Sequence, residues 1–215
     1  MEVNKKRQLR PDTFATLLLA ILAFPMAIPT FRKFFGHNSG FLRDLGFLNG
    51  PGGTAPAWIL AMLIAIVYTG FAVRNVPPVA RTWLRLDWRK LVVLLAAIAA
   101  ATVEEAVFRR IVMDSVVAWG GGAFLQIAVS AVAFGGTHSI FGLIKRNAQA
   151  AWRASLITGI LGGALGVVYL LGDRSLAPCI AAHFLITLAL EPGLLTAAIT
   201  DEWKPSARTE SAVTQ

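Results

Sequence analysis

Charged residues are scarce in this 215-residue chain. They make up 15% of it, and hydrophobic residues make up 56%, whereas about a quarter of a soluble domain is charged. The mean hydropathy is +0.63, and the apolar residues are grouped into runs long enough to cross a bilayer, which takes about 20 residues per helix. This composition excludes a soluble globular domain and predicts an integral membrane protein.

Cysteine and several catalytic signatures are also missing. The single cysteine, Cys179, excludes a disulfide within the chain and every cysteine-based metal motif. Neither a Gly-x-Ser-x-Gly nor a His-Glu-x-x-His sequence occurs, which argues against a serine hydrolase and against a zinc site built on one helix. The net charge of +8 comes from basic residues that flank the apolar runs. They form no basic and aromatic surface, so we expect no nucleic-acid partner.

The apolar runs predict an all-α fold, a polytopic transmembrane helical bundle with about six spans, because a chain in the bilayer core must satisfy its own backbone hydrogen bonds. The predicted spans are roughly Thr13–Thr30, Pro56–Val73, Leu91–Met113, Gly122–Ile144, Ala154–Leu171 and Leu176–Thr200. With the N-terminus inside, the predicted cytoplasmic segments hold fourteen Lys and Arg residues and the outer segments hold four. This bias predicts that both termini are cytoplasmic. The expected location is a bacterial inner (plasma) membrane.

One transmembrane domain, residues 13–200, is expected between a cytoplasmic N-terminal segment, residues 1–12, and a disordered polar tail, residues 201–215. The connection Phe31–Ala55 is expected to lie at the outer interface or to re-enter the membrane. The connection Arg74–Lys90, which contains prolines and tryptophans among arginines, is expected at the inner headgroup layer. Four glycines in the fifth span predict close helix packing, and they are Gly159, Gly162, Gly163 and Gly166.

Charged residues in the third span are the first sign of function, since a charge at the bilayer centre costs about 2.5–3.5 kcal/mol. Glu105 and Arg109 are four residues apart and can form an ion pair on one helix face. Glu104 lies about 100° further round the helix and is left free. A paired carboxylate suits orientation and a free one suits proton transfer, whereas an ion pair that only fixes packing needs one glutamate. Arg110 has Asp114 one turn later and is expected to extend towards the membrane surface.

Two of the three histidines lie on polar stripes inside predicted spans. The stripes have a spacing of four residues and should face the bundle interior; they are Gln126, Ser130, Phe134 and His138 in the fourth span, and His183, Thr187 and Glu191 in the sixth. The third histidine, His37, lies in the outer connection and is given no role.

Glutamate and histidine together can activate a water molecule, and a second histidine can donate a hydrogen bond to an oxyanion. Glu104, His138 and His183 also match a catalytic zinc set that leaves one position for water. The sequence therefore leaves zinc-bound water and glutamate-activated water open. At about 1.5 Å per residue, the predicted span ends put these three residues at different depths, so tilt or shifted ends must bring them together. A transporter or proton-relay protein is a further alternative, although no inverted repeat is found.

Three motifs in this order resemble the CPBP family of CAAX proteases and bacteriocin-processing membrane peptidases. The family patterns are EExxxR, FxxxH and HxxxN, and the residues that match them are Glu104, Glu105 and Arg109, then Phe134 and His138, then His183. Thr187 stands where the family has asparagine. The resemblance covers roughly Leu91 to Glu191.

This resemblance implies an intramembrane endopeptidase that acts on membrane-associated substrates, either CAAX-type or small peptides. Its partners are then the bilayer and a peptide or prenylated protein, and its cofactor is Zn²⁺ if the mechanism needs a metal. By the same resemblance Glu104 activates water with His138, and Glu105 with Arg109 braces the site.

The resemblance further implies that His183 and the side chain at position 187 stabilise the oxyanion. Thr187 donates one hydrogen bond but lacks the reach and the second polar atom of asparagine. Because the loss of one oxyanion donor costs about 100–1000-fold in rate, a weak or inactive relative, a membrane scaffold or immunity protein, is the alternative function.

Overall fold

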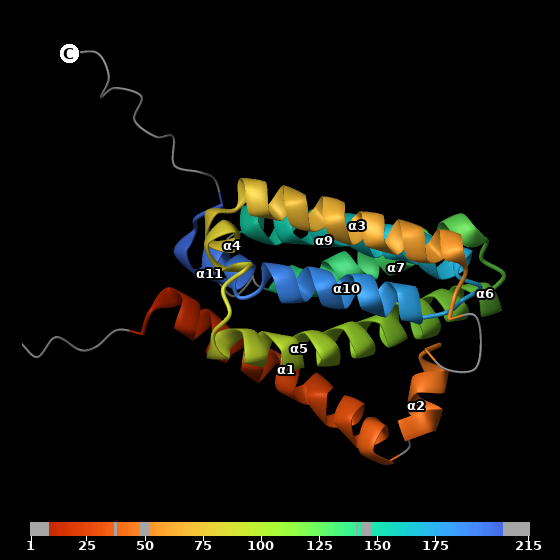
Figure 1. The fold of residues 1–215 in the computed structure, drawn as a ribbon. Coiled ribbons are helices and arrows are strands. Elements are labelled where there is room, and N and C mark those ends of the chain that lie inside the picture. The colour runs from red at the N-terminus through yellow and green to blue at the C-terminus, as the bar shows by residue number, and fades with distance from the viewer. Residues whose placement is uncertain (1–8, 37, 48–51, 141, 143–147, 204–215) are drawn as a thin grey trace, which may run out of the picture.

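The computed structural model describes residues 9–36, 38–47, 52–140, 142 and 148–203, and every regular element in these residues is a helix. The predicted all-α class is therefore confirmed. The helices are α1 (Pro11–Gly36), α2 (Asn38–Asp44), α3 (Ala55–Asn75), α4 (Pro77–Thr82), α5 (Trp88–Glu105), the π-helix η1 (Ala106–Met113), α6 (Asp114–Ala118), α7 (Ala123–His138), α9 (Ala148–Leu171), α10 (Ala177–Leu190) and α11 (Gly193–Thr200) (Figure 1). His37 and most of both terminal segments lie outside the described residues, so the disorder of the tail stays a prediction.

Four helical stretches in the described part of the chain are long and apolar enough to cross a membrane; they are Pro11–Gly36, Ala55–Asn75, Trp88–Ala118 and Ala151–Leu171. A fifth results if α10 and α11, which are bent by 52° at their junction, form one span. The chain is thus a multi-pass integral membrane protein. The helix in the predicted fourth span, α7, is apolar but has only 16 residues, so six spans and cytoplasmic termini stay predictions.

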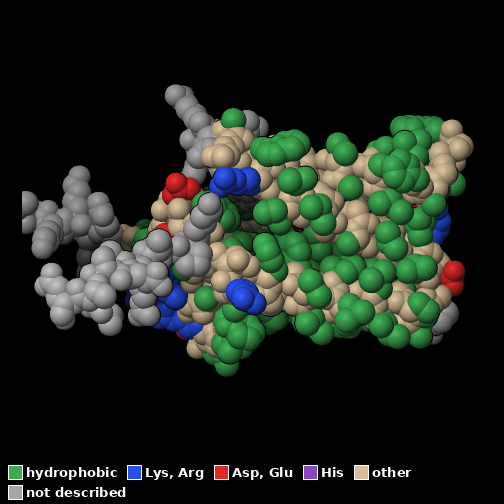
Figure 2. Space-filling model, turned by 90° about the horizontal axis from the view of Figure 1, so that it is seen from above, with side chains coloured by type: hydrophobic (Ala, Val, Ile, Leu, Met, Phe, Trp, Pro, Cys, Tyr) green, Lys and Arg blue, Asp and Glu red, His purple; other side chains and the backbone are tan. Residues whose placement is uncertain are grey.

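Along α3, small residues face the inside of the bundle and large apolar residues face outwards. In α3 the buried side chains are all alanine, whereas Ile59, Ile66 and Phe71 are 61–68% exposed. This distribution suits helices that pack closely with each other and meet lipid on their outer side. Figure 2 shows hydrophobic side chains spread over the middle of one face, with charged side chains gathered towards its ends.

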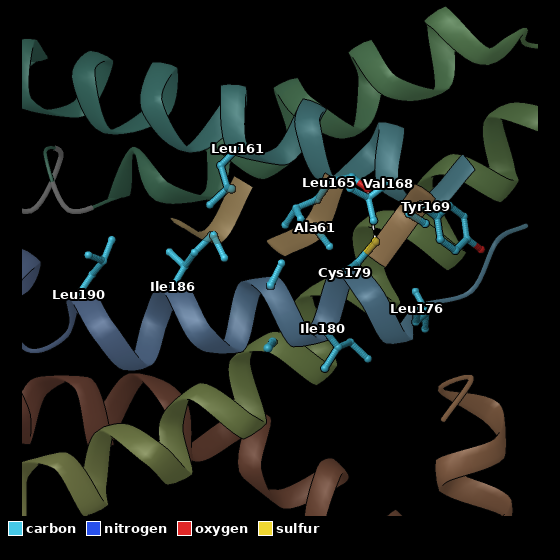
Figure 3. Close-up of a cluster of buried hydrophobic side chains, with 14 of the residues drawn as sticks. Ala61, Leu161, Leu165, Val168, Tyr169, Leu176, Cys179, Ile180, Ile186 and Leu190 are labelled. Carbon is cyan, nitrogen blue, oxygen red and sulfur yellow. Dashed lines mark hydrogen bonds between the residues drawn. The ribbon is translucent and has the colours of Figure 1, made fainter. Parts of the chain in front are cut away.

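The helix α10 lies in the middle of the bundle, between α5 on one side and α3 and α9 on the other (Figure 1). Leu161 and Leu165 of α9 belong to the same buried cluster as Cys179, Ile186 and Leu190 of α10 (Figure 3). The Cys179 thiol donates a hydrogen bond to the carbonyl oxygen of Leu165 at 3.4 Å. This packing fixes the position of the helix that carries His183.

Close contact between α7 and α9 depends on glycine, as the sequence predicted. A Cβ atom at Gly135 would lie 2.3 Å from the carbonyl oxygen of Ser155 and 3.0 Å from Cα of Gly159. A Cβ atom at Gly162 would lie 3.0 Å from Cβ of Phe134. Because no larger side chain fits there without movement, these glycines set how near α7 and its side chains come to α9.

The helix ends differ by a few residues from the predicted span ends, and the causes are local. The third span begins at Trp88 rather than Leu91, because the Asp87 side chain accepts a hydrogen bond from the Arg89 amide at 2.9 Å and caps the helix. The connection Phe31–Ala55 is partly helical, since α1 continues to Gly36 and α2 follows. The sixth span is broken before Gly193, next to a proline that lacks an amide N–H.

Arg110 has a different partner from the one that its spacing suggested. It is exposed, as expected, but its guanidinium group donates to the Asp44 carbonyl oxygen. Asp114 pairs instead with Arg174, which also donates to the Gln126 side chain at 2.7 Å. The turn after α9 thus meets α6 and α7 at this group.

Candidate active site

Glu105 and Arg109 form an ion pair where α5 passes into η1, and both side chains are fully buried. Arg109 Nε donates to Glu105 Oε2 at 2.7 Å, and Nη2 lies 3.4 Å from Oε1. Arg109 Nη1 donates to Ser130 Oγ at 2.6 Å, and this hydroxyl donates to the Phe108 carbonyl oxygen at 3.0 Å. A buried ion pair is stable only when its remaining polar atoms are also hydrogen-bonded. The stripe on α7 supplies that bond, and the predicted pair is present.

His183 joins this ion pair from α10. Its Nδ1 lies 2.9 Å from Glu105 Oε1, and because a carboxylate only accepts hydrogen bonds, Nδ1 carries the proton. Its Nε2 lies 3.9 Å from Glu104 Oε2. The imidazole therefore stands between the two glutamates of α5, with one nitrogen bonded to the buried glutamate and the other turned towards its neighbour.

Glu104 differs from Glu105 in the way the sequence predicted. Its side chain is 16% exposed, and its Oε2 atom is buried without a hydrogen-bond partner among the described residues. A buried acceptor without a partner costs roughly 1–3 kcal/mol, more when it is charged. A carboxylate in this state is suited to hold a small polar molecule such as water.

His138 reaches the same region through Phe134. The Phe134 ring centroid lies 4.8 Å from the His138 ring and 5.7 Å from the His183 ring. His138 Nδ1 lies 2.9 Å from the Phe134 carbonyl oxygen, which only accepts, so in the neutral ring Nδ1 carries the proton and Nε2 has the free lone pair. The two imidazoles, from α7 and α10, thus pack against one aromatic ring.

Thr187 lies one turn after His183 on α10 and is half-buried. Its carbonyl oxygen accepts the Glu191 amide at 3.0 Å. Its hydroxyl makes no hydrogen bond within the described residues. The Glu191 carboxylate, the last member of that stripe, accepts the Leu195 amide at 3.3 Å and so caps α11.

The different depths estimated from the predicted span ends do not keep Glu104 and His183 apart. Since α5 and α10 lie side by side, His183 in the second turn of α10 is level with the last turn of α5. Glu105 contacts both Arg109 and His183, Glu104 approaches His183 at 3.9 Å, and His138 contacts the ring of Phe134.

The same geometry bears on metal ligation. No group of three histidine, cysteine or carboxylate residues in the described part of the chain could hold a metal ion. In the predicted zinc set, His183 and His138 bond Glu105 and a backbone carbonyl through Nδ1, which leaves each Nε2 open. Because the described residues bring no three such ligands around one point, the set does not form a zinc site as it stands; no step is derived through a metal, and a zinc requirement stays a prediction.

Two features of the site were not assigned from the sequence. Ser130 was placed on the interior stripe, but its bond to Arg109 was not foreseen. The π-helix that begins directly after Glu105 has no signal in the sequence; π-turns are frequent at functional sites, and this one carries Arg109 and Phe108.

A family model described as Rce1-like, type II CAAX prenyl endopeptidase, matches residues 86–189. The match runs from just before α5 to the end of α10 and includes both glutamates, both buried-site histidines and Thr187. No curated protein and no solved structure gives a match.

Proposed function

Since residues 86–189 belong to the Rce1-like family of type II CAAX prenyl endopeptidases, we propose that this chain hydrolyses peptide bonds of membrane-associated substrates through a water molecule activated by Glu104 and His138. At the level of the family it is a CAAX-type intramembrane endopeptidase. The proposal adds to this the roles of the individual residues and the substrate, which is a CAAX-type protein or a small peptide.

The observation that carries this proposal is the unpartnered carboxylate oxygen of Glu104, 3.9 Å from His183 Nε2. This separation is too long for a direct hydrogen bond, and one water molecule can bridge it. Glu105 has every oxygen bonded, whereas Glu104 keeps one acceptor for the reaction. The division suits Glu105 for orientation and Glu104 for proton transfer.

Arg109 and Glu105 support the proposal as positioning residues. Arg109 holds Glu105 through two nitrogens, and Glu105 fixes the tautomer and the direction of the His183 ring. With both ring nitrogens protonated, His183 would keep its Nδ1 bond to Glu105 and have the Nε2 proton for an oxyanion. Thr187, one turn further along α10, would be the second donor.

In the proposed reaction, Glu104 carries one proton from the attacking water to the leaving amine. Glu104 takes a proton from the water while the water oxygen forms a bond to the carbonyl carbon of the substrate, and the negative charge on the carbonyl oxygen is stabilised by His183. The carbon–nitrogen bond breaks when the leaving amine receives the proton from Glu104. His138, whose Nε2 has a free lone pair, orients the water before the attack.

The test is to express Glu104→Gln in membranes and to measure hydrolysis of a prenylated C-a-a-X peptide by mass spectrometry. Removal of a general base lowers the rate by about 100–10,000-fold, so we expect turnover to fall by at least about 100-fold. The matched control is Glu191→Gln, since this glutamate caps α11 and still has an acceptor oxygen after the substitution.

Unchanged turnover in Glu104→Gln would reject the assignment of the base. An equal loss in both variants would show that the substitution acts through the fold. A scaffold or immunity function would be favoured only if the unmodified protein bound the peptide without hydrolysing it.

A further inference from the structure

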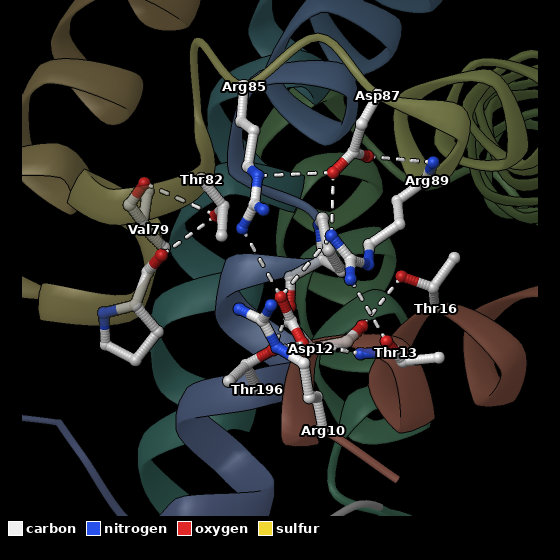
Figure 4. A network of polar contacts seen from close by, with 12 residues as sticks. Arg10, Asp12, Thr13, Thr16, Val79, Thr82, Arg85, Asp87, Arg89 and Thr196 are labelled. Atoms are coloured by element: carbon white, nitrogen blue, oxygen red, sulfur yellow. Dashed lines mark hydrogen bonds and ion pairs between the residues drawn. The ribbon is translucent and has the colours of Figure 1, made fainter.

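A polar cavity with three arginines lies at the end of the bundle where α1 and α5 begin and α11 ends. Figure 4 shows the polar contacts around Arg10, Arg85 and Arg89 at this end. The volume of the cavity is about 230 Å³, and its polar lining residues are Arg10, Arg81, Arg85, Asp12, Glu202, Thr82, Thr196 and Thr200. None of these residues belongs to the group around Glu104. The cavity is therefore a second site, whose use does not depend on the proposed function.

Positive charge exceeds negative charge around this cavity. Arg10, Arg85 and Arg89 each approach a single carboxylate, Asp12, at 3.5 Å, which is longer than the 2.7–2.9 Å typical of charge-assisted hydrogen bonds. Asp87 forms ion pairs with two of the same arginines, at 3.2 Å from Arg85 and 2.7 Å from Arg89. Arg81 pairs with Glu202, so four guanidinium groups share three carboxylates around the cavity, and a further anion would be attracted.

A buried donor without an acceptor lies next to this group. Arg89 is 9% exposed, and its Nε atom has no hydrogen-bond partner in the described residues. It lines a small cavity of about 10 Å³ that shares Asp12, Thr82 and Arg85 with the larger one. A buried guanidinium N–H that lacks an acceptor is costly, and an oxygen atom of an anion or of a water held by it would remove this cost.

Apolar side chains surround the same end of the bundle. Leu84, Leu86 and Trp88, which lie on the connection from α4 to α5 or at its end, are 69%, 90% and 51% exposed. A ligand for this place needs an anionic head and an apolar body. The topology predicted from the lysine and arginine bias puts this end at the cytoplasmic leaflet, where anionic lipids attract basic segments.

We propose that the cavity between α1, α4 and α11 binds the phosphate group of an anionic phospholipid, whose acyl chains lie against the exposed apolar side chains of the α4–α5 connection. Arg10, Arg81 and Arg85 lie at the membrane–water boundary, and their guanidinium groups donate to the phosphate. Thr196 and Thr200, whose hydroxyls donate to the carbonyl oxygens of Pro192 and Thr196, form the polar wall beside the phosphate.

The experiment is native mass spectrometry of the full chain in detergent, titrated with phosphatidylglycerol, with phosphatidylcholine and with inorganic phosphate. The unmodified protein should bind phosphatidylglycerol in preference to phosphatidylcholine. Arg81→Gln and Arg10→Gln, whose side chains are 61% and 67% exposed and can be changed without loss of the fold, should each weaken phosphatidylglycerol binding about fivefold. Glu202→Gln frees Arg81 from its ion pair and should strengthen binding by a similar factor.

The matched control is Arg74→Gln, an exposed arginine in the last turn of α3 that does not line the cavity. It should leave phosphatidylglycerol binding within twofold of the unmodified protein. A loss in Arg74→Gln equal to that in Arg81→Gln would mean general surface attraction and would overturn the proposal. Binding of inorganic phosphate as strong as that of the lipid would assign the site to a free anion and overturn it as well.

Discussion

The ammonium group of Lys90 donates a hydrogen bond to the carbonyl oxygen of Leu188, and this bond connects the first turn of α5 to the last turn of α10. The same Nζ donates to the Glu191 carbonyl oxygen at 3.1 Å. The last carbonyl groups of a helix have no partner within the helix and are stabilised by a cation. These two helices carry the glutamates and His183, so the contact fixes the register in which the site is assembled.

Lys90→Met is therefore expected to lower both stability and turnover. The loss of a charged donor to two carbonyl oxygens should cost about 1–3 kcal/mol of unfolding free energy. The measurements are the thermal unfolding midpoint in detergent and kcat on the prenylated peptide. Lys90→Arg should retain most of both, because arginine still donates there. If Lys90→Met kept the unmodified midpoint and kcat, the contact would have no role in the register.

A second prediction separates positioning from catalysis. Arg109→Met leaves Glu105 as an uncompensated buried charge and should lower the unfolding free energy by about 3–5 kcal/mol. Glu104→Gln, in contrast, should change stability by less than about 1 kcal/mol while it abolishes turnover. Thermal unfolding and peptide hydrolysis, measured on the same preparations, give both quantities.

The double variant Glu105→Met with Arg109→Met sharpens this contrast. Because an apolar pair can replace a buried ion pair at little cost, it should unfold at a higher temperature than Arg109→Met alone. It should stay inactive, since His183 loses the carboxylate that orients it. A double variant less stable than Arg109→Met would contradict the assumed cost of the buried charge.

Much of the fold followed from the sequence, because long apolar runs in a bilayer can only be helices. The ion pair between Glu105 and Arg109 was also predictable, since a spacing of four residues puts two side chains on one helix face. The free state of Glu104 followed from the same geometry. These are local relationships, which the period of the helix determines.

The rest depends on contacts between helices. Nothing in the spacing of α10 says that His183 bonds to Glu105 and faces Glu104, because this needs the depth of α10 relative to α5. The bond from Arg109 to Ser130 likewise depends on how far α7 slides along η1. The π-helix changes the direction of every side chain after Glu105, and residues 106–113 contain no proline or glycine that would have indicated it.

The third prediction concerns Thr187, where the family pattern has asparagine. If position 187 donates to the oxyanion, Thr187→Asn should raise kcat by up to about 100-fold, the lower estimate for one such donor. Thr187→Val, which removes the hydroxyl at nearly constant size, should lower kcat further. The measurement is single-turnover hydrolysis in membranes. Equal rates in all three proteins would remove position 187 from the mechanism.

The fourth prediction uses two neighbouring glycines of α7 that differ only in their surroundings. A Cβ atom at Gly135 would lie 2.3 Å from the Ser155 carbonyl oxygen, whereas one at Gly136 would meet nothing within 4 Å. Gly135→Ala should therefore push α7 away from α9 and cost about 1–3 kcal/mol. Gly136→Ala should be neutral or stabilise by up to about 1 kcal/mol, because alanine favours the helix.

Turnover should follow the same division, because Phe134 and His138 lie on the part of α7 that would move. Gly135→Ala should lower kcat on the prenylated peptide while Gly136→Ala leaves it unchanged, so the second variant controls for the change in helix propensity. If both variants unfolded at the same temperature and turned over equally, close contact between α7 and α9 would not position His138. If Gly135→Ala lowered stability but left kcat unchanged, the site would tolerate a displacement of α7. Such a result would contradict the proposed role of His138, because orienting the water requires His138 to stay in one position.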